Sequence, residues 1–186
     1  CKTVSEASGV LIKETANHFQ AQASLDALVE ASGELKTIAI SLHKIANDIR
    51  FIASGPRAGL GEINLPEVQP GSSIMPGKVN PVMSEAVTMV AARVFGNQST
   101  VTWCGANGHF ELNVFMPVMS KAIMESIELL STVSEVFSSR CVDGITANTE
   151  RCNELIEYSL SMVTSLAPII GYEVAAKIAK ESFKNL

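Results

Sequence analysis

A seven-residue repeat of aliphatic side chains is the feature that most limits what this chain can fold into. The repeat has two interleaved series: Leu28, Leu35, Leu42 and Ile49, and, three residues further on, Ala31, Ile38, Ile45 and Ile52. Apolar a and d positions sustained over several heptads are typical of a helix in a bundle. We expect a helix over residues 26–52, roughly 40 Å long at about 1.5 Å per residue.

Further helical patterns follow along the chain. Apolar residues at spacings of three and four predict a helix that begins near Asn80 and ends at Gly105, and another from about Asn113 to Arg140. Shorter helices are expected over residues 149–161 and 172–184, with a break at 168–171, whereas residues 1–16 read as a loop or a short leading element. No segment has a convincing strand period. The sequence therefore predicts an all-α fold: a long-helix bundle over residues 1–142 and the start of a small helical C-terminal domain over 143–186.

Composition excludes several classes of protein. With 47% hydrophobic and 18% charged residues, the chain can bury a real core. Its net charge of −5 offers no basic excess to neutralise phosphates, so we expect no nucleic-acid partner. No apolar run approaches the roughly 20 residues of a membrane span, so no membrane partner is expected either.

The cysteines indicate the cellular compartment of the protein, and the chain ends indicate whether it is part of a longer protein. Four cysteines without a C-x-x-C pair read as reduced thiols, which indicates a cytoplasmic protein. His109 and Glu111 have the spacing of a zinc-deaminase H-x-E, but no P-C-x-x-C follows, so no metal is expected. The chain begins at Cys1 and stops at Leu186 within a helix-like pattern, which suggests a piece of a longer protein.

The segment between the first two long helices is rich in glycine and proline, and its core reads GSSIMPGKVNP over residues 71–81. A phosphate loop would need G-x4-G-K-[ST], which fails because five residues separate Gly71 from Gly77 and Lys78 is followed by valine. Two alternatives remain open from spacing alone. The segment is a catalytic loop that handles a small dianion through hydroxyls, a lysine charge and a helix start, or a Gly/Ser turn with a solvated lysine.

The segment GSSIMPGKVNP resembles the signature loop GSSxMPxKxNP of the fumarase/aspartase superfamily. Further stretches resemble class II fumarases in the same order along the chain: NDIRFIASGPRAGLGEINLPE, GHFELNVFMPVM, CVDGITANTERC and SLAPIIGYEVAAKIAK. The GHFELN stretch favours the fumarase branch over aspartases, which tend to have a Gln-rich equivalent. The resemblance covers nearly all of the chain, and it implies that the bundle is the central helical domain of that superfamily.

The resemblance also implies roles for individual residues. Ser72 matches the general base that takes a proton from the carbon beside a carboxylate. Ser73, Lys78 and Asn80 match positions that contact the substrate carboxylates, and Glu85 matches a glutamate that pairs with the loop lysine and affects activity. Backbone N–H groups of a tight loop could stabilise the serine oxyanion, and each such donor is worth roughly 3 kcal/mol.

The implied reaction is the reversible hydration of fumarate to (S)-malate, without metal or organic cofactor. The implied assembly is a homotetramer whose active sites are shared between subunits. The histidine-bearing segment that supplies the family's proton donor is absent here, since His18, His43 and His109 do not match it, so we expect this chain alone to be inactive. The alternatives are an aspartase-type ammonia-lyase, a non-catalytic helical oligomer and a coiled-coil interaction module.

Overall fold

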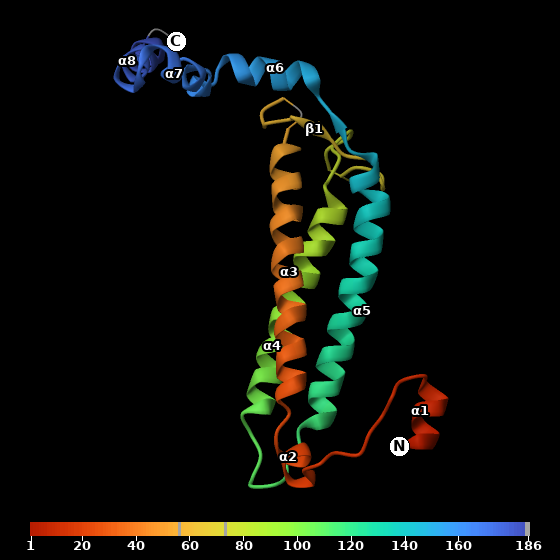
Figure 1. The fold of residues 1–186 in the computed structure, drawn as a ribbon. Helices are drawn as coiled ribbons and strands as arrows, with labels where there is room; N and C mark the ends of the chain where they lie inside the picture. Colours follow the sequence, from red (N-terminus) through yellow and green to blue (C-terminus); the bar gives the residue numbers. More distant parts are fainter. Residues whose placement is uncertain (56, 73, 185–186) are drawn as a thin grey trace. The chain divides into compact units, whose positions relative to one another are not determined.

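The computed structural model describes residues 1–55, 57–72 and 74–184. Figure 1 shows the order of its elements along the chain. The elements are α1 (Lys2–Ser8), α2 (His18–Ala23), α3 (Asp26–Ile52), β1 (Ile63–Asn64), α4 (Val82–Gly105), α5 (Met116–Arg140), the 3-10 helix η1 (Val142–Gly144), β2 (Thr146–Ala147), α6 (Thr149–Glu157), the 3-10 helix η2 (Leu160–Ser165), α7 (Ala167–Ile170) and α8 (Tyr172–Lys184).

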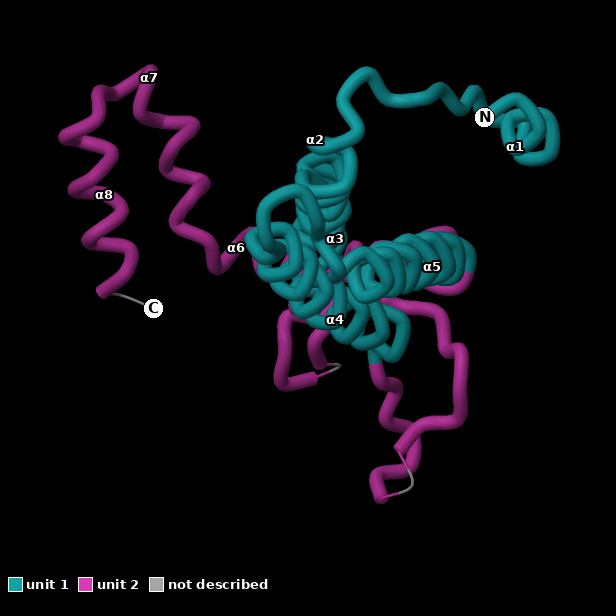
Figure 2. The backbone as a smooth tube through the Cα atoms, turned by 90° about the horizontal axis from the view of Figure 1, so that it is seen from below, with its two compact units in different colours: residues 1–47, 81–139 teal, residues 48–80, 140–186 magenta. Residues whose placement is uncertain are grey.

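The chain divides into two compact units, which Figure 2 colours separately. The first comprises residues 1–47 and 81–139, and the second comprises residues 48–80 and 140–186. These units each combine two separate stretches of chain, whereas the expected bundle and C-terminal domains are continuous stretches that meet near Asp143. The expected domain boundary therefore stays a prediction.

In the first unit, α4, α5 and the part of α3 that belongs to it lie side by side (Figures 1 and 2). Their contacts form two apolar clusters. One is centred on the buried Val101, Met119 and Ile123, and the other on the buried Val94 and Leu130. At an edge-to-face distance of 5.5 Å between ring centroids, Trp103 and Phe115 add an aromatic pair. The predicted long-helix bundle is confirmed.

The heptad prediction is largely right for α5 and only half right for α3. In α5 the seven-residue series Met116, Ile123, Leu130 and Phe137 is buried except at Met116, which is 37% exposed. In α3 the Leu28 series is half-buried, but Ile38 and Ile45 are 49% and 48% exposed. The reason is that α4 and α5 cover only one side of α3.

Small residues, which the heptad analysis did not single out, line the covered side of α3. Ser32, Ala39 and Ala46 are its buried residues, and they recur every seven residues on the covered side. Their short side chains let the neighbouring helices approach closely. Gly105 acts in the same way on α4, since a Cβ there would lie 2.6 Å from Val29 Cγ2.

The second unit contains a strand pair that the sequence analysis did not foresee. Strands β1 and β2 pair antiparallel, with Ile63 opposite Ala147 and Asn64 opposite Thr146. Two residues each are too few for a period-2 pattern to show. After β2, the predicted helix over 149–161 ends earlier, at Glu157, and the predicted break at 168–171 contains the short helix α7. The helix over 172–184 is confirmed.

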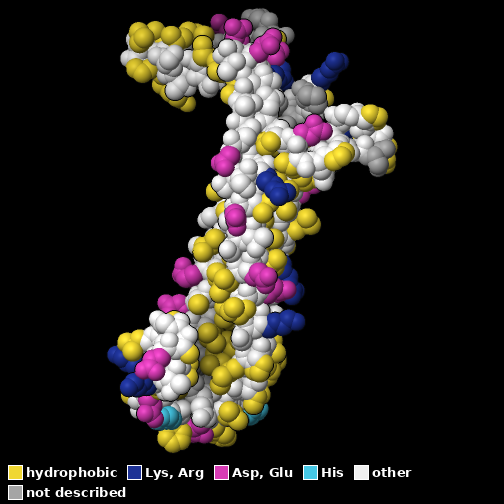
Figure 3. Space-filling model, turned by 90° about the vertical axis from the view of Figure 1, so that its right-hand side faces the viewer, with side chains coloured by type: hydrophobic (Ala, Val, Ile, Leu, Met, Phe, Trp, Pro, Cys, Tyr) yellow, Lys and Arg dark blue, Asp and Glu magenta, His cyan; other side chains and the backbone are white. Residues whose placement is uncertain are grey.

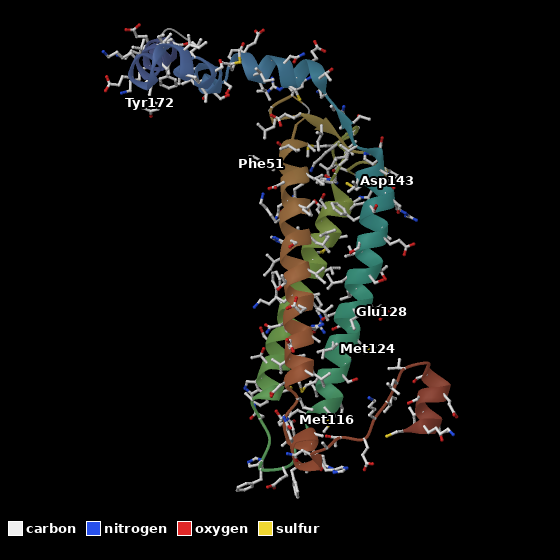
Figure 4. All side chains as sticks on the ribbon, in the orientation of Figure 1. Phe51, Met116, Met124, Glu128, Asp143 and Tyr172 are labelled. Atoms are coloured by element: carbon white, nitrogen blue, oxygen red, sulfur yellow. The ribbon has the colours of Figure 1, made fainter. Side chains whose placement is uncertain are left out.

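Large apolar side chains remain exposed on the three long helices of the first unit. Figure 3 shows hydrophobic side chains gathered over this unit, and Figure 4 labels Met116 and Met124 along α5. The most exposed include Met89, Trp103 and Met124. Among the described residues, no helix combines the length and the apolar character that crossing a bilayer requires.

Candidate active site

The loop over residues 71–78 closes on itself. The backbone N–H of Ser72 donates to the carbonyl of Lys78 at 3.2 Å. Gly71 lies so close to the same carbonyl that a Cβ at this position would be 2.3 Å from the Lys78 oxygen. Glycine is therefore required at the first position of the signature because the two ends of the loop touch there.

A tight turn reverses the chain inside this loop. The Lys78 N–H donates to the Met75 carbonyl at 3.2 Å, and Gly77 has φ +80°. A turn with proline second and glycine third, the latter at positive φ, is a type II turn. Pro76 and Gly77 occupy these two positions, so the sequence itself fixes the turn that brings Lys78 back to Ser72.

The Ser72 hydroxyl sits inside this loop and accepts two backbone hydrogen bonds. The N–H groups of Ile74 and Met75 each donate to Ser72 Oγ at 3.2 Å. The side chain of Ser72 is half-buried, whereas those of Ile74 and Met75 are exposed. Two pre-placed N–H donors of this kind can stabilise negative charge on an oxygen.

The remaining sequence-predicted site residues lie as follows. Lys78 is exposed and Asn80 is half-buried, both in the second unit with Ser72. Glu85 is half-buried in the first turn of α4, in the first unit. Its pairing with Lys78 therefore stays a prediction. Ser73 lies outside the described residues.

The start of α4 follows directly after the loop. The N-cap position is Pro81, and no side chain caps the helix there. The unpaired N–H groups and the helix dipole make such a start favourable for negative charge. Glu85 donates its backbone N–H to the Pro81 carbonyl at 3.0 Å, while its carboxylate is the acidic group of the first turn.

The part of the chain that the structure describes contains no cluster of metal-binding side chains. No group of three or more His, Cys, Asp or Glu side chains there could hold a metal ion. His109 and Glu111 belong to a tight turn closed by hydrogen bonds between His109 and Leu112, and both are exposed. The predicted absence of a cofactor stays an expectation.

Comparison with known proteins connects this loop to a family. A family model described as "Lyase" matches residues 1–96. This chain belongs to that lyase family. It is 59% identical to the class II fumarate hydratase of Mycobacterium tuberculosis over 94% of its length, and 58% identical to the mitochondrial fumarate hydratase of Danio rerio over 98%.

Solved structures of this lyase family also resemble the chain. The fumarate lyase:delta crystallin of Brucella melitensis superposes with a TM-score of 0.90 at 49% identity, over 97% of this chain and 42% of that one. The fold class and the resemblance to class II fumarases are thus confirmed. The chain spans 37% and 36% of the length of the two fumarate hydratases.

Two details of the site were not found from the sequence. Backbone N–H donors to the serine oxygen were expected, but not that they belong to Ile74 and Met75, whose side chains gave no chemical signal. The loop closure through Lys78 is also a backbone contact. The Pro76-Gly77 pair, a type II turn signature, is the one signal that could have predicted the reversal.

Proposed function

We propose that the whole protein to which this chain belongs catalyses the reversible hydration of fumarate to (S)-malate, with Ser72 as the general base. The observation that carries this proposal is the pair of N–H groups directed at Ser72 Oγ. A serine hydroxyl is a poor base in water, so a base role needs a site in which its oxyanion is stabilised. Similarity to class II fumarate hydratases supports the choice of substrate.

In the malate-to-fumarate direction, the Ser72 alkoxide takes a proton from the carbon beside a carboxylate. The electron pair of the broken C–H bond moves onto that carboxylate as a carbanion. That electron pair then forms the C=C bond of fumarate as the C–O bond at the neighbouring carbon breaks, and the hydroxyl leaves as water with a proton from a donor outside this chain. The Ser72 hydroxyl loses its proton to solvent and the donor regains one, so the site is restored.

Lys78 ends the closed loop and Asn80 follows it by two residues, and with Ser73 they are the proposed contacts to the substrate carboxylates. The carbanion places extra negative charge on one carboxylate. A lysine charge and loop amides bind that state more strongly than the substrate, which is the condition for lowering the barrier. Glu85 would hold Lys78 in its protonated form by pairing with it.

The proposed assembly is a homotetramer with active sites shared between subunits. Its support in this chain is the set of large apolar side chains exposed on the long helices, including Ile38, Ile45, Met89 and Met124. Exposed apolar area of this kind marks interaction surfaces. Sedimentation of the whole protein should give a tetramer, and a monomeric enzyme with full activity would refute the assembly.

The division into a bundle domain over 1–142 and a C-terminal domain over 143–186 belongs to the same proposal, as does the cytoplasmic location. For the location, the support in this chain is that its four cysteines form no disulfide with one another. Free thiols persist in a reducing compartment.

Substrate tests on the whole protein separate the alternatives. We expect loss of fumarate absorbance on hydration, appearance of fumarate from (S)-malate, and no ammonia from L-aspartate. Activity should survive a chelator, because the proposed mechanism uses no metal. Ammonia release would instead support the aspartase-type lyase, and no turnover of either substrate would support a non-catalytic helical oligomer. The 186-residue chain by itself should be inactive.

A further inference from the structure

Two successive backbone carbonyls in the segment after α3 are bound by one arginine of α6. Arg151 Nε donates to the Leu60 carbonyl at 3.0 Å, and Nη2 donates to the Gly59 carbonyl at 3.3 Å. Nη1 donates to Glu154 Oε2 at 2.6 Å. The planar fork of a guanidinium can serve several acceptors at once, which a lysine ammonium cannot do with the same geometry.

The next two carbonyls of the same segment are bound by neighbours of this arginine. Asn148 Nδ2 donates to the Gly61 carbonyl at 3.0 Å, and the Asn148 backbone N–H donates to the Glu62 carbonyl at 2.8 Å. Cys152 Sγ also approaches the Glu62 carbonyl, at 3.4 Å. Four consecutive carbonyls, at 59–62, are thus held by the start of a single helix.

The backbone N–H groups of the same segment, residues 59–62, form hydrogen bonds with the end of α3 and the residues that follow it. The Glu62 N–H donates to the Ile52 carbonyl at 3.0 Å, and the Leu60 N–H donates to Ser54 Oγ at 3.2 Å. A Cβ at Gly59 would lie 2.3 Å from the Ser54 carbonyl oxygen, so the backbones touch there. With the β1–β2 pairing that follows, residues 59–64 are held on both sides.

Only residues 65–70 separate this fixed segment from the closed loop at 71–78. Pro66 and Pro70 restrict the connection. Pro66 also packs against Gly144, where an added Cβ would meet its ring at 2.9 Å. A chain fixed up to residue 64 and stiffened by two prolines limits the conformations open to the loop that follows.

The structure assigns Arg151 as a positioning residue for the Ser72 loop. This inference rests on the proposed function, because the purpose of the fixed loop is to hold Ser72 Oγ and its two N–H donors in place for catalysis. Arg151 touches no substrate in this account. It acts by binding the carbonyls of Gly59 and Leu60, and so by fixing the segment that leads to the loop.

The test compares R151A with the unchanged whole protein in two measurements. In hydrogen exchange, the amides of residues 59–64 and of residues 72–79 should both exchange faster in R151A, on the order of tenfold. In steady-state kinetics with fumarate, kcat should fall by about tenfold to a hundredfold while KM stays nearly constant, since a misplaced base impairs chemistry more than binding. R151K, which keeps the charge, should be intermediate and serves if R151A does not fold.

Two controls separate positioning from general stability. E154Q keeps both arginine–carbonyl bonds and should match the unchanged protein in exchange and in kcat. Millimolar guanidinium should restore part of kcat to R151A, whereas ammonium at the same concentration should not.

The other possible results test the role of Arg151 and the proposed function separately. Faster exchange at 59–64 with unchanged exchange at 72–79 and unchanged kcat would overturn the inference, as would no change in exchange at all. If the unchanged protein does not hydrate fumarate, the proposed function fails, and the exchange at 72–79 alone decides whether Arg151 positions the loop.

Discussion

Arg93 on α4 donates two hydrogen bonds to a single carboxylate oxygen of Glu125 on α5, from Nε at 3.0 Å and from Nη2 at 2.8 Å. Asn97 Nδ2 donates to the same oxygen at 2.8 Å. These donors favour the charged carboxylate, and chiefly the Arg93 hydrogen bonds hold the pKa of Glu125 below its ordinary value. The cluster fixes the register of the two helices.

Stability of the bundle should depend on pH through Glu125. Because its pKa in the folded state lies below the ordinary value of 4.5, its contribution is fully present above that value and is lost as pH falls through the folded pKa. Thermal unfolding of the unchanged protein and of E125Q should show a gap in Tm at neutral pH that narrows in acid. E128Q, at an exposed position of the same helix (Figure 4), is the control and should change Tm little. An E125Q gap that stays constant down to pH 3 would contradict this.

Asn97 should contribute measurably to the free energy of unfolding. It is buried, and its amide donates to Glu125 and, at 3.1 Å, to Ser126 Oγ. N97A removes the amide donor to the buried Ser126 Oγ and one of the three donors to Glu125 Oε2, so we expect a loss of about 1–3 kcal/mol in urea unfolding. S99A, at an exposed position two residues later, should change the free energy by less than about 0.5 kcal/mol. Equal effects of the two substitutions would contradict the role of Asn97.

The bundle could be predicted from the sequence because the spacing of apolar residues that indicates a helix repeats within each helical segment. The bounds of α3 and α8 agree with the patterns, since seven-residue and three-to-four-residue spacings repeat along each helix. The pattern could not show which series would be covered. Ile38 and Ile45 fit the repeat as well as Leu35 does, yet the small Ser32, Ala39 and Ala46 are the residues that neighbouring helices bury.

Close packing of α3 on α4 depends on Gly105. Its added Cβ would meet Val29 Cγ2 at 2.6 Å, so G105A should force the helices apart and destabilise the protein by about 1–3 kcal/mol. G96A is the matched control within α4, because its Cβ would meet nothing within 4 Å. It should stabilise the helix by about 0.5–1 kcal/mol. Urea unfolding of both variants checks the pair, and a G105A as stable as the unchanged protein would refute the close contact.

Closure of the Ser72 loop depends on Gly71. In G71A the new Cβ would collide with the Lys78 carbonyl oxygen, so the hydrogen bond from the Ser72 N–H should be lost. We expect circular dichroism to remain that of a helical protein, while fumarate turnover by the whole protein falls by at least about a hundredfold. G33A, whose Cβ meets nothing within 4 Å, should keep its turnover. Full activity in G71A would show that the closed loop is not the active conformation.

The candidate site was only partly predictable for a different reason. Ser72, Lys78 and Asn80 stand out as residue types in a fixed motif. The groups that surround Ser72 Oγ are backbone N–H groups, and every residue except proline has one, so their position depends on the turn. The role of Arg151 is harder still to predict from the sequence. It lies 91 residues from Leu60, and no local pattern predicts that contact.

The turnover of S72A in the whole protein decides whether Ser72 is the general base. Alanine removes the hydroxyl that accepts the Ile74 and Met75 N–H groups, but it keeps the backbone N–H that donates to the Lys78 carbonyl. If Ser72 is the general base, kcat for fumarate hydration should fall by about 10²–10⁴-fold with the helical content and the Tm nearly unchanged. An S72A protein that folds normally and keeps a kcat within a few-fold of the unchanged enzyme would contradict the central claim.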